Sequence, residues 1–444
     1  MFTFARPRSR RVRGAGPDVE RFVAASHLRH GESILPAPPP TAARGPTACV
    51  GRPPARQYLH VRVAIDARQA AAPRPSGVGE YTLQLVRRMP RARPDWSFVA
   101  WYLDARRPLR RDRLGAASPN VRERAVPIPS RLFARAAGSL DAPRIEWFGG
   151  FDVLFAPNFV PPPTRAGRIV LTVHDLAFRL DPDSAPSGTR AWLEALPRAL
   201  DRATRVLVPS ECTRRDLLGE FDVDAARVRV TPLGVDRDRY RPATAERVAE
   251  ARARFGIERP YLLFVGAIEP RKNLALLVRA FARMAPGPFA PTLVIAGSGV
   301  SWNPEGSEQL ARALEEIPAA TAARVRTTGY VGPDDKVALL TGAEALVFPS
   351  THEGFGLPVL EAMACGTPVV TSNTSSLLEV AGDAAIRVDP ADAGAVATAM
   401  EDLLADGALR EALRAKGLER AAEFDWDSTA ELTARALEEA AAEG

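Results

Sequence analysis

The feature that most constrains the fold is a regular alternation of short apolar runs with longer amphipathic segments, and it occurs twice. In the first half, the apolar runs have the length of buried strands and lie at 61–66, 98–103, 153–156, 169–173 and 206–209. Segments with helical spacing lie between them at 79–89, 187–203 and 210–218. Strands that alternate with helices predict a parallel sheet with crossover connections.

After the turn-like segment 232–236, the same pattern starts again. Strands are predicted at 261–265, 292–296, 325–328, 345–348 and 368–371, and helices at 274–284, 307–316 and 358–364. Two such halves predict an α/β protein with two doubly wound Rossmann-like domains, 61–235 and 236–444, which face each other across a cleft. We expect the last helix to cross back to the N-terminal domain. Because doubly wound sheets bind ligands at the carboxyl ends of their strands, the cleft is the predicted active site.

Composition excludes several other classes of protein. The chain has 444 residues, more than a single core usually organises, and its 46% hydrophobic and 25% charged residues exclude global disorder. No run approaches the roughly 20 apolar residues that a membrane-spanning helix needs. The three cysteines, Cys49, Cys212 and Cys365, are too far apart for a zinc ribbon or a disulfide framework. They favour a reducing cytoplasm.

The first 60 residues are rich in arginine and proline and predict a disordered leader. Arg10 and Arg11 are not followed by an apolar segment, which argues against an export signal. A start of translation near Val50 or Val61 is an alternative hypothesis for this region.

Charge is distributed unevenly along the chain. The leader carries a net charge of +7, residues 61–235 carry +9, and residues 236–444 carry −10. Within the basic half, the segment Arg87–Arg135 contains 13 arginines and four acids, and its Arg107, Arg110 and Arg111 are spaced to share a helical face. This segment is either a solvated surface or a surface for anionic lipid headgroups or an anionic acceptor. The residues leave both interpretations open.

Two candidate sites lie at strand ends in the N-terminal half. Gly77 and Gly79 follow the first strand at a helix start, where their backbone N–H groups could approach an anion. A dinucleotide-binding fingerprint would require a glycine at position 82, where this chain has Thr82, so a nicotinamide cofactor is disfavoured. The alternative to an anion site at Gly77 and Gly79 is a tight turn that binds no ligand. His174 follows the strand at 169–173 and could donate to a sugar hydroxyl or stabilise developing charge; otherwise it caps a turn.

A third candidate is the pair Arg271 and Lys272, which follows the strand at 261–265. A guanidinium fork beside an ammonium suits a diphosphate, whereas an exposed loop pair is the alternative. Lys272 is notable because only three of the 59 basic residues are lysine.

The most specific candidate is the segment 350–370. Pro358 suits the first position of a helix, so the residues Gly354, Phe355, Gly356 and Leu357 present backbone N–H groups at a helix N-terminus. Glu353 precedes this loop and Glu361 lies within the helix, and each carboxylate could accept hydrogen bonds from hydroxyl groups of a sugar or a ribose. Glu353 could also act only as a capping acid.

These motifs together resemble the retaining, GT-B-type glycosyltransferases of family 4. The resemblance runs from about Val61 to the C-terminus and rests on the E-x7-E spacing of Glu353 and Glu361, and on Gly77-Val78-Gly79, His174-Asp175, Val208-Pro209-Ser210, 232–236 and 269–273. The segments around Arg271 and at 372–383 are most similar to mannosyltransferases of bacterial polysaccharide assembly. The resemblance implies transfer of a hexose with retention of the anomeric configuration, so that an α-nucleotide-sugar gives an α-glycoside, with GDP-mannose as the favoured donor.

The resemblance also implies the roles of the candidate residues. Arg271 and Lys272 would neutralise the diphosphate, Glu361 would hold the ribose, and Glu353 would hold the donor sugar together with the loop N–H groups. His174 would contact the sugar from the other domain, and Gly77 and Gly79 would close over the phosphates. The chain departs from the family at Ala267, where many members have arginine, and at His352, where a larger or aromatic residue is common.

No cofactor and no metal is expected, since no D-x-D string closes a predicted strand. In the family, the leaving phosphate takes the acceptor proton, so the protein would supply charge stabilisation and orientation. The expected acceptor is a glycan or a lipid-linked glycan, with the enzyme in the cytoplasm or at the inner membrane face. The alternatives are a nucleotide-sugar epimerase, a polysaccharide phosphorylase, an inactive scaffold and an arginine-rich nucleic-acid-binding protein. A nucleic-acid-binding function would leave the glutamate-bearing loop unexplained.

Overall fold

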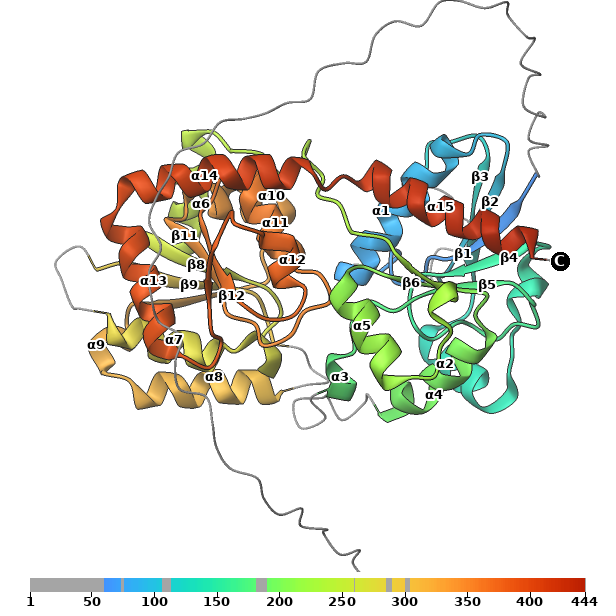
Figure 1. Cartoon of the computed structure of the whole chain (residues 1–444), viewed down its shortest axis with the longest axis horizontal. Helices are drawn as coiled ribbons and strands as arrows, with labels where there is room; N and C mark the ends of the chain where they lie inside the picture. The colour runs from blue at the N-terminus through green and yellow to red at the C-terminus, as the bar shows by residue number, and fades with distance from the viewer. Residues whose placement is uncertain are drawn as a thin grey trace, which may run out of the picture. The chain divides into compact units, whose positions relative to one another are not determined.

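The computed structural model describes residues 60–72, 76–105, 113–180, 190–258, 260–284, 290–299 and 304–443 (Figure 1). Almost all of the predicted leader, and with it Arg10 and Arg11, lies outside the described residues, as do Arg107, Arg110 and Arg111.

The N-terminal half forms a parallel seven-stranded sheet in the order β3-β2-β1-β4-β5-β6-β7. Its strands are β1 (Arg62–Asp66), β2 (Ser97–Leu103), β3 (Val121–Val126), β4 (Val153–Ala156), β5 (Ile169–Thr172), β6 (Arg205–Val208) and β7 (Val228–Val230). Strands β4, β5 and β6 are buried along their whole length. Continuous apolar runs of this kind are typical of parallel strands that helices cover on both faces.

The helices of this half connect consecutive strands. They are α1 (Gly77–Ala92), α2 (Ser130–Leu140), α3 (Ala177–Leu180), α4 (Arg190–Arg202) and α5 (Glu211–Glu220), with short 3₁₀ turns at Ile145–Phe148 and Ala225–Arg227. Ser76 caps α1 and Ser210 caps α5, since each side chain accepts a hydrogen bond from a backbone N–H three residues on. The cap of α5 lies two residues after β6 ends at Val208, whereas a longer segment joins the end of β1 at Asp66 to the cap of α1.

The C-terminal half forms a parallel six-stranded sheet in the order β10-β9-β8-β11-β12-β13. Its strands are β8 (Tyr261–Val265), β9 (Thr292–Ala296), β10 (Val325–Gly329), β11 (Ala345–Phe348), β12 (Val369–Ser372) and β13 (Ile386–Val388). Its helices are α6 (Ala245–Phe255), α7 (Leu274–Arg283), α8 (Glu305–Glu316), α9 (Ala319–Ala322), α10 (Pro333–Gly342), α11 (Leu357–Ala364), α12 (Leu377–Ala381), α13 (Ala393–Ala405) and α14 (Gly407–Ala422), and a 3₁₀ turn spans Pro270–Lys272.

The last helix, α15 (Trp426–Ala442), packs against α1 and the first sheet (Figure 1). Arg93 and Glu431 pair across this contact at 2.7 Å. The chain passes from the second sheet to α15 beside Gly234, where a Cβ atom would lie 2.2 Å from the backbone nitrogen of Trp426. Only glycine permits this close approach of the two connecting segments.

The α/β class with two doubly wound parallel sheets is confirmed, and every predicted strand is present with small shifts at its ends. Three strands were not predicted, namely β3, β7 and β13. All three lie at a sheet edge and are only partly buried.

Candidate active site

Arg271, Lys272 and Glu353 meet in the C-terminal half, although about 80 residues separate them. Arg271 Nη1 lies 2.8 Å from Glu353 Oε2, and Lys272 Nζ pairs with Glu353 Oε1. The 3₁₀ turn after β8 positions both cations, while the loop between β11 and α11 positions the carboxylate. Glu269 also contacts Arg271, at 2.9 Å from Nε. One buried carboxylate therefore holds two adjacent cations.

The charges of this cluster are strongly coupled. Burial alone would raise the pKa of Glu353, but the charges of Arg271 and Lys272 lower that pKa to about 2. Burial also opposes the charge of Arg271, yet Glu353, Asp175 and Glu269 raise its pKa above the ordinary value. Glu353 is thus a carboxylate at neutral pH, and an anionic ligand of the two cations would compete with it.

The glycine loop that follows Glu353 is held by close contacts. A Cβ atom on Gly354 would lie 1.7 Å from the carbonyl oxygen of His174, and the Gly354 carbonyl accepts hydrogen bonds from Ser210 Oγ and Thr213 Oγ1. Gly356 has φ of 105°, which favours glycine. These contacts fix the loop ahead of α11, the position from which its N–H groups were predicted to bind a ligand.

The ring of Phe355, the aromatic residue of this loop, packs inside the protein. Phe355 is buried, and its ring packs edge-to-face on Phe424 with centroids 5.7 Å apart. Any contact of Phe355 with a sugar would therefore use its backbone N–H, as predicted from the sequence, together with those of Gly356 and Leu357.

His174 is half-buried directly after β5, and its ring is already engaged. Its Nε2 lies 2.8 Å from the carbonyl oxygen of Pro157, and Tyr81 packs edge-to-face on the ring at 4.9 Å. A carbonyl oxygen only accepts, so Nε2 carries the hydrogen. Burial lowers the pKa of His174, and the Pro157 carbonyl and Asp175 only partly offset this.

The ring is therefore neutral at neutral pH, and its remaining nitrogen, Nδ1, is an acceptor. From its position in the sequence, His174 was expected to donate a hydrogen bond or to stabilise charge. The structure favours instead acceptance of a hydrogen bond from a hydroxyl group. Its catalytic role stays a prediction.

Gly77 and Gly79 form the start of α1, as expected for a helix N-terminus. The Gly79 N–H donates to the Ser76 cap at 3.3 Å, and a Cβ atom on Gly77 would meet no atom within 4 Å. Packing among the described residues therefore does not require glycine at position 77. No hydrogen bond between described residues joins these glycines to Arg271, Lys272 or Glu353.

Glu361 lies on α11, eight residues after Glu353, and has partners that were not predicted from the sequence. Its Oε2 pairs with Lys336 Nζ from α10, and Lys336 Nζ also lies 3.4 Å from the hydroxyl of Tyr240. The rarity of lysine was the signal that could have singled out Lys336. Of the two departures from the family pattern, His352 contacts the Arg271 cluster through its carbonyl oxygen, which accepts a hydrogen bond from Arg271 Nη1 at 3.2 Å.

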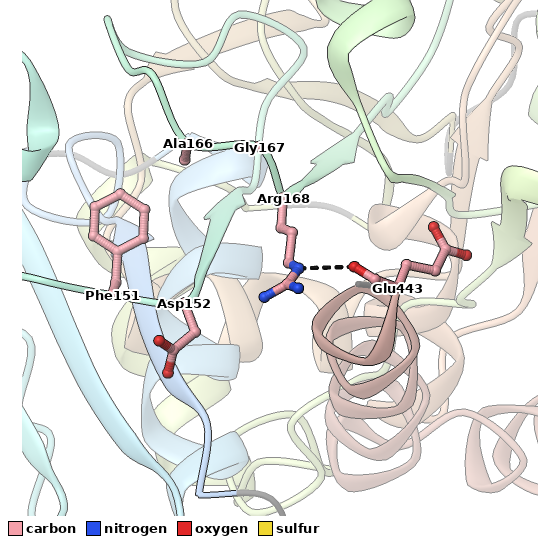
Figure 2. Close-up of a pocket in the computed structure, with 6 residues that line it drawn as sticks. All are labelled: Phe151, Asp152, Ala166, Gly167, Arg168 and Glu443. Atoms are coloured by element: carbon pink, nitrogen blue, oxygen red, sulfur yellow. Dashed lines mark hydrogen bonds between the residues drawn. The ribbon is translucent and has the colours of Figure 1, made fainter.

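Two hollows lie outside this cluster. One of about 430 Å³ lies beside the C-terminal end of α15 and the starts of β4 and β5, where Arg168 Nε donates to the Glu443 carbonyl at 2.9 Å (Figure 2). The other, of about 220 Å³, contains Tyr240 and Arg237. Neither hollow is lined by a residue that was predicted for the donor site.

Two further features bear on chemistry and location. Among the described residues, no group of three His, Cys, Asp or Glu side chains could hold a metal ion. The helices in the described part of the chain are also too short or too polar to span a membrane.

Comparisons with known proteins show similarity in both halves of the chain. The model of the family described as "Glycosyltransferase Family 4" matches residues 75–239, and the model of the family described as "Glycosyl transferases group 1" matches residues 248–420. O-antigen chain mannosyltransferase B of Escherichia coli is 31% identical over 363 residues, which cover 80% of this chain and 93% of that protein.

Solved structures show the same fold at lower identity. Sucrose-phosphate synthase from Thermosynechococcus elongatus matches with a TM-score of 0.66 and 22% identity, covering 85% of this chain and 98% of its own. HepE of Anabaena, in complex with UDP and glucose, matches with a TM-score of 0.64 and 16% identity over 86% and 100% of the two chains. The chain is therefore a GT-B-fold hexosyltransferase that belongs to the group 1 and family 4 glycosyltransferases.

Proposed function

We propose that this glycosyltransferase moves a hexose, with mannose favoured, from a nucleotide-sugar to a glycan or lipid-linked acceptor and retains the anomeric configuration. The name of the Escherichia coli relative supports mannose, and the UDP and glucose in the HepE complex support a nucleotide-sugar donor. GDP-mannose is accordingly the favoured donor, and neither a metal nor a cofactor takes part in this proposal.

The observation that carries the proposal is the buried pairing of Arg271 and Lys272 with Glu353. A guanidinium and an ammonium on one turn match the two phosphates of a nucleoside diphosphate. Their carboxylate partner lies on the glycine loop, next to the N–H groups of Gly356 and Leu357. A diphosphate on the cations would therefore place the attached sugar against Glu353 and this loop.

In the proposed reaction, the bond between the sugar C1 and the phosphate oxygen breaks while a bond from C1 to the acceptor oxygen forms. The acceptor proton passes to the leaving phosphate, so no protein base is needed. Arg271 and Lys272 stabilise the negative charge that develops on the diphosphate. Glu353 and the Nδ1 atom of His174 would accept hydrogen bonds from sugar hydroxyls and so orient the ring.

A donor panel tests this function. The protein is incubated with GDP-mannose, UDP-glucose, UDP-galactose or UDP-N-acetylglucosamine and a soluble mannobiose acceptor, and released nucleoside diphosphate is measured. We expect the fastest release from GDP-mannose, and an α-linked product by the C1–H1 coupling constant in NMR. Fastest release from a UDP-sugar would contradict mannose, and a β-linked product would contradict retention.

We further propose that the enzyme works in the cytoplasm, against an anionic membrane, through the segment Arg87–Arg135. Its described part presents exposed Arg122 and Arg124 on edge strand β3, and exposed Arg131 and Leu132 on α2. Trp147, which follows α2, is 63% exposed. Basic and apolar side chains together favour binding at a lipid surface, with each arginine contributing about 1 kcal/mol.

Liposome flotation tests the membrane contact. The full chain should bind vesicles that contain anionic lipid at low salt and be released near about 0.5 M salt, where screening acts within about 4 Å. Reversing the charges of Arg122, Arg124 and Arg131 should weaken binding at least tenfold, whereas reversing the exposed Arg247, Arg279 and Arg312 of the acidic half should not. Absence of binding at low salt would mean that this surface is only solvated and that the acceptor is soluble.

A further inference from the structure

The use of lysine in this chain is selective. Of 59 basic residues only three are lysine, and two of these pair with the two glutamates of the E-x7-E motif. Lys272 pairs with Glu353, and Lys336 pairs with Glu361. The third, Lys416, pairs with Asp383 at the surface, where the two side chains are 51% and 84% exposed. Lysine thus accompanies each motif carboxylate.

Lys336 and Glu361 form a largely buried pair between α10 and α11. The side chains are 21% and 10% exposed. Tyr240 closes one side of the pair, with its hydroxyl 3.4 Å from Lys336 Nζ and its ring centroid 5.3 Å from that atom. Burial raises the pKa of Tyr240, and the charge of Glu361 and a hydrogen bond to it raise that pKa further. Tyr240 therefore stays protonated and can donate to the carboxylate.

The two oxygens of Glu361 differ in their surroundings. Oε2, the atom beside Lys336 Nζ, is inaccessible to solvent and accepts no hydrogen bond from the described residues, so the ion pair with Lys336 is its contact. The exposed tenth of the side chain therefore belongs to its other atoms. A carboxylate offers about four lone-pair directions, so a cation at one oxygen leaves the other oxygen able to accept hydrogen bonds.

We propose that Lys336 is a positioning residue for donor binding, which fixes Glu361 through the buried Oε2 so that Oε1 accepts hydrogen bonds from the ribose hydroxyls of the nucleotide. This inference rests on the proposed nucleotide-sugar donor site. A buried carboxylate without a cation is costly and would turn toward solvent or take up a proton, and either change would weaken its bond to a hydroxyl group. The compact ammonium places its charge at one point beside Oε2, and the planar guanidinium fork of an arginine would not reproduce that geometry.

The preference for ribonucleotides over their 2′-deoxy analogues tests the positioning role of Lys336 most directly. Affinities of the full chain for UDP, GDP and their 2′-deoxy analogues are measured by calorimetry, and the ratio of each pair gives the preference for ribose. Wild type should prefer ribose about tenfold, since a hydrogen bond to a charged group is lost in the analogue. In Lys336→Met the preference should fall below twofold, and Lys336→Arg should restore it only in part. The matched control Lys416→Met should keep the wild-type preference.

A second variant separates positioning from general damage to the fold. If Lys336 acts through Glu361, then Lys336→Met should change the ribose preference no further in a Glu361→Ala background, where no buried carboxylate is left unpaired. A wild-type preference in Lys336→Met would overturn this inference and leave the donor site intact. Failure of wild type to bind either nucleotide would overturn the donor site and this inference together.

Discussion

Replacing Lys272 by Met is expected to lower kcat for hexose transfer by about 100- to 1000-fold, the effect of removing one donor to a developing oxyanion. Lys272 is buried and pairs with Glu353. Arg271 alone would then stabilise the leaving diphosphate and would still be shared with Glu269 and Glu353. The measurement is steady-state release of nucleoside diphosphate from the donor that proves fastest.

Lys416→Met is the matched control for this variant. It removes the same functional group from a surface pair in the same half of the chain and should leave kcat within twofold of wild type. Thermal unfolding of both variants shows whether lost activity reflects lost folding. A Lys272→Met protein that is folded and retains more than a third of the wild-type kcat would contradict the diphosphate role.

Replacing Glu353 by Gln is expected to lower kcat by a similar factor of about 100 or more, since a charged acceptor to the donor sugar is lost. Affinity for the nucleoside diphosphate alone should not weaken. Arg271 and Lys272 lose the carboxylate that competes with the diphosphate, so this affinity should stay equal or increase. Calorimetry with UDP and GDP measures it, and a tenfold weaker affinity would mean that Glu353 binds the nucleotide rather than the sugar.

The same variant makes a prediction about pH and stability. The folded pKa of Glu353 is about 2 against an ordinary value of 4.5, so its ionised form stabilises the fold. This contribution, about 3 kcal/mol, is fully present above pH 4.5 and is lost as the pH falls toward 2. The stability gap between wild type and Glu353→Gln should therefore narrow by about 1 to 1.5 kcal/mol between pH 6 and pH 3.5. Urea unfolding at both pH values measures the gap, and a constant gap would contradict the ionic role.

The central strands of both sheets could be predicted because burial on both faces makes them continuous apolar runs. The strands Val153–Ala156, Ala345–Phe348 and Tyr261–Val265 were placed with their observed bounds. The edge strands β3, β7 and β13 could not be recognised in this way, because charged residues interrupt their apolar residues. These are Arg122, Glu123 and Arg124 in β3 and one central arginine in each of β7 and β13. An edge strand has a neighbour on one side only, so its sequence need not be apolar throughout.

Much of the candidate site could also be predicted, because its residues lie on short local motifs at the carboxyl ends of strands. The sequence predicted Arg271, Lys272 and Glu353 at the carboxyl ends of strands, and the pairing of β8 with β11 in the structure brings those ends together. Their direct pairing did not follow, because it depends on side-chain geometry between distant segments. The pairing matters for function, since it means that a carboxylate already occupies the cations.

Two other features depended on contacts between distant segments. The bond from His174 to the carbonyl of Pro157 joins loops after β4 and β5, and it decides which ring nitrogen is left to accept. Lys336 occurs in an ordinary helical pattern, and only the packing of α10 against α11 brings it to Glu361. The His174 contact has no local signal in the sequence, and for Lys336 the rarity of lysine marks the residue but does not identify its partner.

The central claim is that Arg271 and Lys272 hold the diphosphate of a nucleotide-sugar, and calorimetric titration of wild type, Lys272→Met and Lys416→Met with UDP and with GDP tests it most directly. We expect wild type and Lys416→Met to bind at least one of the two nucleotides with equal affinity, and Lys272→Met to bind it at least tenfold more weakly. Equal affinity of all three proteins, or binding of neither nucleotide by wild type, would contradict the claim.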